Sequence, residues 1–200
     1  KTVTITSNYS GSDVNNYTVT DQSNTTASIT PRPANVSGIT VFGLAVNNKE
    51  YDGTIIAPLD TSSVLYSGIL PADSADVTGS YTGVFTDPNV DTGKTVNITS
   101  SYSGAKAGNY NFTNQSTTTG NIIPKVLTAT ASAANKTYDA TNSATTTLNL
   151  SGLVGSETLN TTNTSTFNNK NVGTGKTVTV NSITLADGTG LAANYSISAG

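Results

Sequence analysis

The 200-residue sequence contains no cysteine, histidine, methionine or tryptophan. The absence of imidazole and thiol groups excludes histidine acid–base catalysis, thiolate nucleophiles, disulfide bonds and the soft-metal sites that these side chains build. These absences exclude most enzyme mechanisms for this chain. We therefore expect no enzymatic activity and no catalytic residues.

Charge is also scarce. Nine basic and twelve acidic side chains give a net charge of −3, and they are spread along the chain without runs. Nucleic-acid-binding proteins cluster Lys and Arg, so we expect no nucleic-acid partner. No apolar stretch approaches the roughly 18 residues that span a bilayer, and no signal peptide is visible. We expect no membrane insertion and interpret the chain as a soluble fragment or a mature segment.

Thr, Ser and Asn are abundant, but a low net charge and many β-branched residues are not typical of disorder. Apolar residues alternate with small or polar ones at residues 1–6, 94–99, 126–133 and 176–185. This period of two, dominated by Thr, Val and Ile, is typical of half-buried strands. Clusters of Gly, Asn, Asp and Pro separate these segments as turns, and no helical periodicity of useful length is present.

Internal repeats organise the chain. Residues 94–124 repeat residues 1–31 without a gap, at an offset of 93. Other matched segments lie at offsets down to 82, so short insertions separate the copies, as surface loops tolerate. The unit is therefore a domain of roughly 80 to 95 residues. We predict an N-terminal partial copy (1–31, the closing part of a truncated repeat), a complete central copy (32–124) and a C-terminal copy that lacks its last strand (125–200).

One short segment, NNKEYDGT, places an aromatic, a carboxylate and a glycine side by side. It contains Tyr51 and Asp52 and recurs as ANKTYDAT, which contains Tyr138 and Asp139. We interpret each pair as a structural signature, with the tyrosine packed at a domain end and the aspartate accepting hydrogen bonds in the following turn. Ala140 stands in place of the glycine, which predicts that this position requires no positive φ.

The order of the motifs is more specific than any one of them. They are Pro-Lys-x-Leu-Thr (124–128), Asn-Lys-Thr-Tyr-Asp (135–139), Ser-Gly-Leu (151–153), Phe-x-x-x-Asn-Val-Gly-x-Gly-Lys-x-Val (167–178) and Ala-Ala-Asn-Tyr-Ser-Ile (192–197). This order resembles the YDG-type repeat, which with its MBG-type relatives occurs in tandem in very large secreted bacterial surface proteins, including filamentous-haemagglutinin-like adhesins. The resemblance covers essentially the whole chain. It implies an extracellular location, at the cell surface or secreted, and no catalytic residues.

We predict an all-β fold of tandem, small antiparallel domains. An immunoglobulin-like sandwich is favoured, and a β-grasp-like unit without a proper helix is the alternative. The recurring aromatic residues should form the core, namely Phe85, Phe167, and the tyrosines that follow asparagine, Tyr17, Tyr110 and Tyr195. The connections between copies carry prolines and no Gly-Ser runs, which predicts semi-rigid joints.

Calcium binding is the alternative use of the acidic side chains, because this ion takes roughly six to eight oxygen ligands. The carboxylates that could contribute are Asp73, Asp76, Asp87, Asp91 and Asp187, with Asp52 or Asp139 at a domain junction. The C-terminal copy keeps an acid, Glu157, near the position of the first group. It replaces Asp87 and Asp91 by Asn169 and Gly173. We therefore expect no cofactor, with calcium as the metal to test.

Two classes of function stay open. The chain is either a structural stalk or fibre module, forming a semi-rigid rod of tandem domains, or an adhesive module that binds a host glycan or protein. The exposed loops at 9–16 and 102–109 would carry such binding. A third arrangement is a filament whose identical subunits complete one another by strand addition. The expected partners are neighbouring repeats, identical subunits, or a host glycan or protein.

Overall fold

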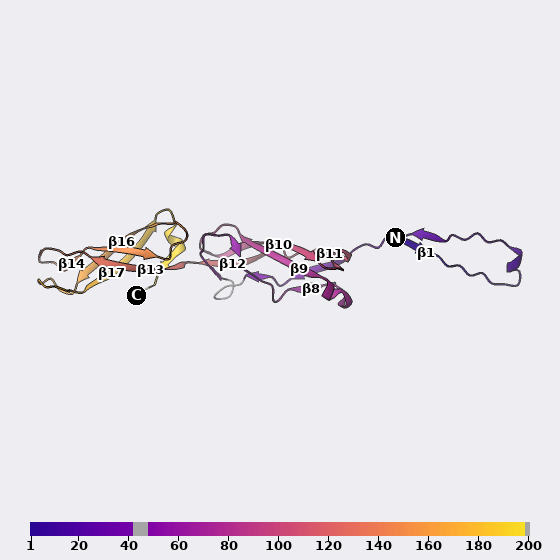
Figure 1. Ribbon diagram of the computed structural model, residues 1–200, viewed down its shortest axis with the longest axis horizontal. Coiled ribbons are helices and arrows are strands. Elements are labelled where there is room, and N and C mark those ends of the chain that lie inside the picture. The colour runs from indigo at the N-terminus through magenta and orange to yellow at the C-terminus, as the bar shows by residue number, and fades with distance from the viewer. Residues whose placement is uncertain (42–47, 199–200) are drawn as a thin grey trace. The chain divides into compact units, whose positions relative to one another are not determined.

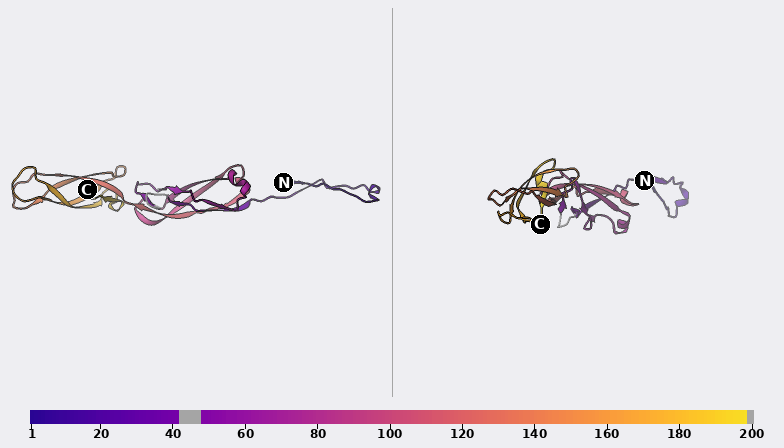
Figure 2. Two further views of the ribbon diagram at one scale, coloured as in Figure 1. Left: turned by 90° about the horizontal axis from the view of Figure 1, so that it is seen from below. Right: turned by 60° about the vertical axis from the view of Figure 1, so that its left-hand side comes forward.

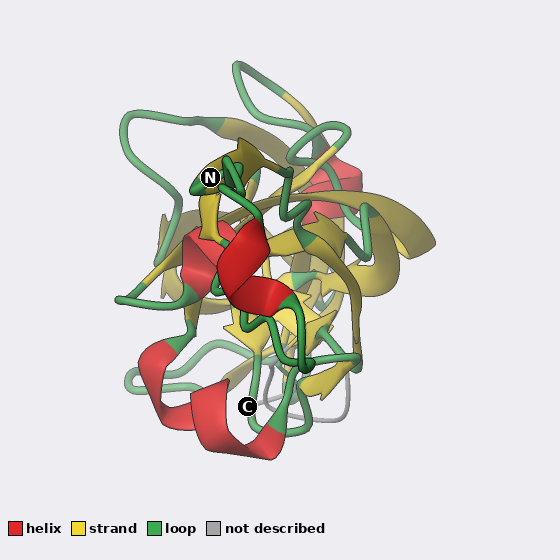
Figure 3. Ribbon diagram, turned by 90° about the vertical axis from the view of Figure 1, so that its right-hand side faces the viewer, coloured by secondary structure: helices red, strands yellow, loops and turns green. Residues whose placement is uncertain are grey.

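The computed structural model describes residues 1–41 and 48–198, which form strands joined by turns (Figure 1). The first residue of the NNKEYDGT segment lies outside these ranges. Within them, all four helices are short 3-10 segments, drawn in red in Figure 3, and none is long and apolar enough to cross a membrane. The prediction of a β-rich chain is confirmed.

The elements of the N-terminal partial copy and the central copy follow in chain order. They are β1 (Thr2–Thr4), η1 (Val14–Asn16), β2 (Asn24–Thr26), β3 (Arg32–Ser37), β4 (Thr40–Val41), β5 (Asn48–Glu50), β6 (Ile56–Ala57), β7 (Leu59–Asp60), β8 (Leu65–Ser67), η2 (Pro71–Asp76), β9 (Thr78–Phe85), β10 (Asp91–Ser103), η3 (Ala107–Asn109), β11 (Tyr110–Thr113) and β12 (Thr117–Ile123). The C-terminal copy contains β13 (Lys125–Ala133), β14 (Ser143–Ala144), β15 (Thr146–Ser151), β16 (Leu159–Phe167), β17 (Val178–Asp187), η4 (Ala192–Asn194) and β18 (Tyr195–Ile197).

The strands form several small sheets, and some strand pairs are parallel. The sheet orders are β1-β2, β5-β12-β10-β9-β6, β11-β3-β8, β15-β13-β18, β14-β16-β17 and β4-β7. Parallel pairs join β11 to β3, β12 to β5 and β13 to β18. The expectation of purely antiparallel domains was wrong, because in each of these pairs an early strand of a copy pairs with a late one after a long crossover.

The strand register repeats between copies. Thr2 pairs with Thr26 in the β1–β2 pair, and Thr95 pairs with Thr119 in the β10–β12 pair, 93 residues later on each strand. A three-residue 3-10 turn also precedes each Asn-Tyr junction, as η1, η3 and η4. The repeat of residues 1–31 at 94–124 is therefore also a structural repeat, with the same strand register.

The chain divides into two compact units, and each has its own apolar cluster. The first unit consists of Lys1–Val36, Tyr66–Gly79 and Tyr102–Thr113. Its buried cluster is Ala34, Val77 and Tyr110. The second unit consists of Ser37–Leu65, Ser80–Ser101 and Asn114–Gly200. Its buried cluster is Tyr51, Ala57, Phe85, Val96, Ile122, Leu127 and Tyr195, with residues from both the central and the C-terminal copies.

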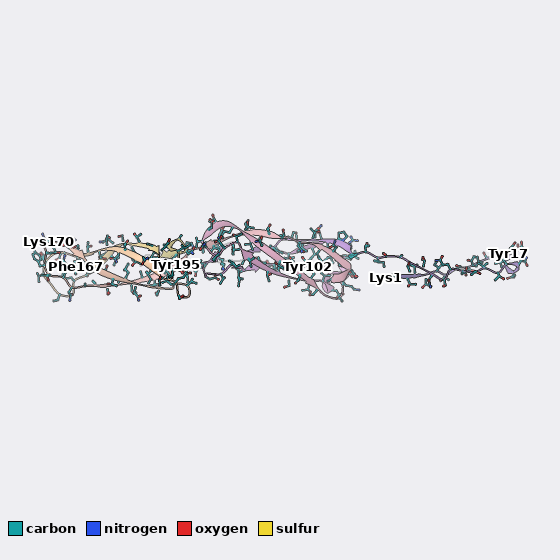
Figure 4. The ribbon with its side chains drawn as sticks, turned by 90° about the horizontal axis from the view of Figure 1, so that it is seen from above. Lys1, Tyr17, Tyr102, Phe167, Lys170 and Tyr195 are labelled. Atoms are coloured by element: carbon teal, nitrogen blue, oxygen red, sulfur yellow. The ribbon has the colours of Figure 1, made fainter. Side chains whose placement is uncertain are left out.

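Tyr17 is not part of a core, contrary to the prediction. Its side chain is 74 % exposed at the turn of the β1–β2 hairpin, where Figure 4 labels it. The hairpin, drawn in indigo in Figures 1 and 2, is a two-stranded ribbon, and its residues are exposed apart from the half-buried Val14. A two-stranded ribbon has no facing layer that could bury an aromatic ring.

Candidate functional site

A shared carboxylate joins the central copy to the C-terminal copy inside the second unit. Tyr51 Oη donates a 2.7 Å hydrogen bond to Glu157 Oε1, and Tyr195 Oη donates a 2.6 Å hydrogen bond to Glu157 Oε2. The two rings meet edge to face, with centroids 5.4 Å apart and planes at 80°. We call Tyr51, Glu157 and Tyr195 the tyrosine clamp.

Local structure fixes each member of the clamp. Tyr51 follows strand β5, and its N–H donates to the carbonyl of Ile123 at the end of β12. Tyr195 opens strand β18 after the η4 turn. Glu157 lies in a turn closed by its own N–H on the Val154 carbonyl, while the Val154 N–H donates to Tyr195 Oη at 3.0 Å. Backbone hydrogen bonds thus fix the segments that carry Tyr51 and Glu157, and the Val154 N–H contacts the Tyr195 hydroxyl directly.

Burial and charge both keep the clamp tyrosines protonated. Tyr51 and Tyr195 are only 4 % and 5 % exposed. Desolvation, reinforced by the Glu157 carboxylate, raises the pKa of Tyr51 above its usual value and the pKa of Tyr195 to about 12. A neutral phenol donates to a carboxylate, whereas a phenolate would repel it.

An asparagine forms a second polar link between the same two copies. Asn194, from η4, is 2 % exposed. Its Oδ1 accepts from the Val90 N–H at 2.9 Å, and its Nδ2 donates to Asn89 Oδ1 at 3.0 Å. Lys125 adds an ion pair with Glu50 at 2.8 Å, but both of these side chains are substantially exposed, so the pair contributes little. The buried amide is the more specific link.

The turn after Tyr51 is closed by side-chain hydrogen bonds that recur in the C-terminal copy. Asp52 Oδ1 accepts from the Thr54 N–H at 2.8 Å, and the Lys49 ammonium lies 2.7 Å from the same oxygen. Desolvation of Asp52 is outweighed by the Lys49 and Thr54 hydrogen bonds, which lower its pKa. In the C-terminal copy, hydrogen bonds from Lys136 and Thr141 lower the pKa of Asp139 to about 2.

The prediction that this turn needs no positive φ was wrong. Gly53 has φ +76° and Ala140 has φ +62°, so both occupy the left-handed region. The hydrogen bonds around the aspartate hold the turn in this conformation even when alanine carries the strain. A Cβ atom at Gly53 would lie 3.1 Å from a Val154 methyl group, which leaves little room for a side chain at the junction.

The first unit repeats half of the clamp. Tyr110 Oη donates to Asp73 Oδ2 at 2.7 Å and accepts from the Leu70 N–H at 3.1 Å. Asp73 and Leu70 each lie 84 residues before Glu157 and Val154, which surround Tyr195 in the same way. Every copy that contains this region therefore carries a carboxylate bonded to the tyrosine that follows asparagine.

The comparison with known families agrees with this repeated geometry. The YDG domain family matches residues 30–119 and 123–200. The chain belongs to the YDG domain family. No curated protein and no solved structure matches it in the same comparisons. The resemblance stated from the motif order is thus confirmed, with two YDG copies over residues 30–200.

The structure brings only some of the predicted aromatic residues into the interior of the YDG copies. Phe85 is 1 % exposed and lies beneath the Lys49 ammonium, 6.0 Å from the ring centroid. Phe167 lies 5.9 Å from Lys136 in the matching arrangement but is only partly buried. Tyr138, the counterpart of Tyr51, is 57 % exposed, so the prediction of a packed tyrosine is wrong at this position. A tyrosine of this turn is therefore buried in one copy and exposed in the other.

The candidate calcium ligands do not gather into a site. Asp73 accepts from Tyr110, and Asp87 Oδ1 accepts from Lys94 at 2.6 Å. Asp187 accepts from the Ala192 N–H. Within residues 1–41 and 48–198, no group of three or more acidic side chains is placed to hold a metal ion.

Two junction residues were missed as partners from the sequence. The sequence singled out Glu157 as an acid near a candidate metal group and Asn194 as the residue before a core tyrosine, and neither as a partner across the junction. The signal that could have identified Glu157 is its alignment with Asp73, an acid at the same repeat position in both YDG copies.

Proposed function

We propose that the chain is a structural stalk or fibre module of a bacterial extracellular surface protein, in which tandem YDG domains form a semi-rigid rod. The observation that carries this proposal is the tyrosine clamp, because one carboxylate is satisfied by phenols from two successive copies. A carboxylate shared in this way keeps both hydrogen bonds only while the two copies hold a fixed relative orientation.

The energetics of the clamp support a stiff joint. Opening the junction would separate an edge-to-face aromatic pair, which contributes about 0.5–1.5 kcal/mol beyond its area burial. It would also remove one of the two phenols that satisfy Glu157, and hydrogen bonds to charged groups contribute about 1.5–3 kcal/mol. The connection through Pro124, between β12 and β13, adds no flexible spacer.

Within this proposal, each YDG copy is an immunoglobulin-like sandwich. The two three-stranded sheets of the C-terminal copy, β15-β13-β18 and β14-β16-β17, supply the two layers that this arrangement needs. A β-grasp unit packs a helix on its sheet, and the helical segments described in this copy amount to the three residues of η4. A crystal structure of the chain would decide between them by the strand order within each copy.

The extracellular assignment rests on the family. YDG-type repeats are expected in secreted surface proteins, and the sparse charge and Thr-rich strands suit a solvated stalk that binds little nonspecifically. Antibody against the chain should label intact, unpermeabilised cells of the source bacterium. Labelling that requires permeabilisation would contradict the assignment.

Spin labels can test the stiffness of the joint. The chain has no cysteine, so Thr99→Cys on β10 and Thr184→Cys on β17, both exposed, give a unique label pair across the junction. Double electron–electron resonance should return one narrow distance distribution. The same pair in a Tyr51→Phe, Asn194→Ala background should return a broad one. A broad distance distribution in the chain that carries only the two labels would contradict the semi-rigid rod.

A glycan array on the same protein separates the stalk from the adhesive alternative. The stalk predicts no saccharide-specific signal. A specific signal that is lost when the loop at 9–16 or 102–109 is replaced would favour the binding module.

A further inference from the structure

The segment that opens the central copy pairs with the segment that closes it, and the paired strands run in the same direction. Strand β3 pairs in parallel with β11 over four residues, beginning with Arg32 opposite Tyr110. Strand β5 pairs in parallel with β12 over three residues, ending with Glu50 opposite Ile123. We call these two pairings, with the glutamine bridge that lies between them in the chain, the parallel seam.

The glutamine bridge joins the two segments at a point where they do not pair as strands. Gln115 Oε1 accepts from the Ile39 N–H at 3.0 Å, and Gln115 Nε2 donates to the Ile39 carbonyl at 2.8 Å. Ile39 is 1 % exposed, and buried backbone groups of this kind need a hydrogen-bond partner within the protein. One side chain of the closing segment thus satisfies both backbone groups of a buried residue of the opening segment.

The first pair of the seam recurs in the C-terminal copy. Lys125 follows Arg32 by 93 residues and lies opposite Tyr195, as Arg32 lies opposite Tyr110. The hydroxyl of Tyr110, like that of Tyr195, is bonded to a carboxylate and to a backbone N–H in a turn outside the paired strands. In both YDG copies, the first strand is therefore paired in parallel with a late strand that is itself anchored by its tyrosine.

Chain direction decides how the seam responds to a pull. The chain enters the central copy at Arg32, the first residue of β3, and leaves it at Ile123, the last residue of β12. Two parallel segments that are loaded at opposite ends slide along each other, so the hydrogen bonds between them share the load. An antiparallel pair that is loaded at its two open ends peels instead, and its bonds break one after another. Tension along the chain therefore places the seam in shear.

We propose that the parallel seam is a tension-bearing element, which keeps a YDG copy folded when the chain is pulled along its length. This inference goes beyond the proposed function, because the tyrosine clamp stiffens the joint between copies, whereas the seam resists extension inside one copy. Burial supports it. Ala34 on β3 and Ile122 on β12 are 0 % and 1 % exposed, and hydrogen bonds in such a low-dielectric setting are stronger than in water.

Pulling the full chain in two directions tests the seam. Because the chain has no cysteine, a pair of introduced cysteines places the two handles of an optical trap unambiguously. Thr30→Cys with Thr128→Cys, both at exposed positions, loads the central copy through its entry and its exit. In a second protein, Thr162→Cys with Thr184→Cys, at exposed and directly opposed positions of β16 and β17, peels an antiparallel pair as the reference.

The rupture force along the chain should exceed the peeling force by about twofold or more at the same loading rate, because several bonds must break together before the copy opens. Gln115→Ala should lower the rupture force along the chain and leave the peeling force unchanged. Gln22→Ala is the matched control. Gln22 lies 93 residues earlier, at the same repeat position, and its amide donates to the Asn24 carbonyl within the β1–β2 pair, so neither force should change.

A rupture force along the chain that is no higher than the peeling force overturns the inference. If Gln115→Ala lowers both forces equally, the glutamine bridge carries no specific load, and that part of the inference fails. The comparison of directions changes no residue of the seam, so it decides the matter even where Gln115→Ala does not fold. The spin-label distances test the proposed function separately. A narrow distance distribution together with equal forces would leave a stiff rod without a tension-bearing seam.

Discussion

Tyr51 and Glu157 lie 106 residues apart in the chain and are joined by a 2.7 Å hydrogen bond between a phenol and a carboxylate. The same carboxylate bonds Tyr195 of its own copy, so one acid is part of both the internal fold of a domain and its attachment to the preceding one. Stability of the C-terminal copy and stiffness of the joint should therefore respond together to changes at this residue.

Removing the Tyr51 hydroxyl tests the clamp directly. Tyr51→Phe should lower the free energy of unfolding by about 1.5–3 kcal/mol, since a hydrogen bond to a charged group is lost. Tyr138→Phe is the matched control, because it removes the equivalent but exposed hydroxyl, and it should change stability by less than about 0.5 kcal/mol. Urea titration followed by circular dichroism measures both. Equal effects would show that the Tyr51 hydroxyl does not stabilise the protein through the junction.

A double-mutant cycle separates the pair from its surroundings. Glu157→Gln and Tyr51→Phe, alone and combined, should give a coupling energy of about 0.5–3 kcal/mol, as residues in one hydrogen-bond network do. The cycle of Glu157→Gln with Tyr138→Phe should give no coupling, because Tyr138 does not contact that acid. Additivity in the first cycle would contradict the clamp.

Asn194 offers a second comparison between equivalent positions. Asn194→Ala leaves the Val90 N–H without its acceptor inside the junction, which should cost about 1–3 kcal/mol. Asn109→Ala changes the same repeat position where the side chain is exposed, so its effect should stay within about 0.5 kcal/mol. Thermal unfolding by calorimetry distinguishes the two, and a cost at Asn109 as large as at Asn194 would rule out the junction as its source.

The left-handed turn gives a prediction in the stabilising direction. Ala140→Gly should raise the free energy of unfolding by about 0.5–1 kcal/mol, because relief of a left-handed penalty of about 1–2 kcal/mol exceeds the entropic cost of glycine, about 0.5–1 kcal/mol.

The reverse change adds crowding to backbone strain. Gly53→Ala should destabilise more than Gly93→Ala, since both positions have positive φ but only the Gly53 side chain would meet Val154. Denaturation midpoints of the three variants test this order, and a neutral Gly53→Ala would remove the argument for close approach at the junction.

Alkaline pH should open the clamp. A pKa raised in the folded state means that folding favours the protonated phenol, so this stability is fully present below about pH 10. It is lost as pH rises toward about 12, the folded-state pKa of Tyr195. The urea midpoint should therefore fall between pH 10 and 12. Tyr195→Phe should reduce this slope without abolishing it, because burial also raises the pKa of Tyr51 and Tyr110.

Much of the local structure could be predicted from sequence, because it depends on local patterns. Alternation at 176–185 predicted the strand now seen as β17, and the ungapped repeat at an offset of 93 agrees with a strand register that the β1–β2 and β10–β12 pairs share. The Asp52 turn also has the predicted hydrogen bond to the backbone N–H two residues on. These features depend on residues close in sequence, or on the same sequence segment occurring twice.

The contacts between copies could not be predicted in the same way. No local pattern indicates that Glu157 meets Tyr51, since their meeting depends on how one domain seats on another. Tyr51 and Tyr138 carry the same signature, yet one is buried and the other exposed, because burial depends on the neighbour rather than on the residue. Ala140 likewise shows that residue type alone does not give φ when a hydrogen-bonded turn imposes it.

The location of the clamp residues within the repeat has a consequence for inheritance. The tyrosine of the Tyr-Asp turn and the acid bonded to the Asn-Tyr strand are present in both YDG copies, in the same order. Unequal crossing-over between such units would delete or duplicate a whole copy and leave an intact joint at each new boundary. The number of domains would then change while the connection between neighbours stays the same.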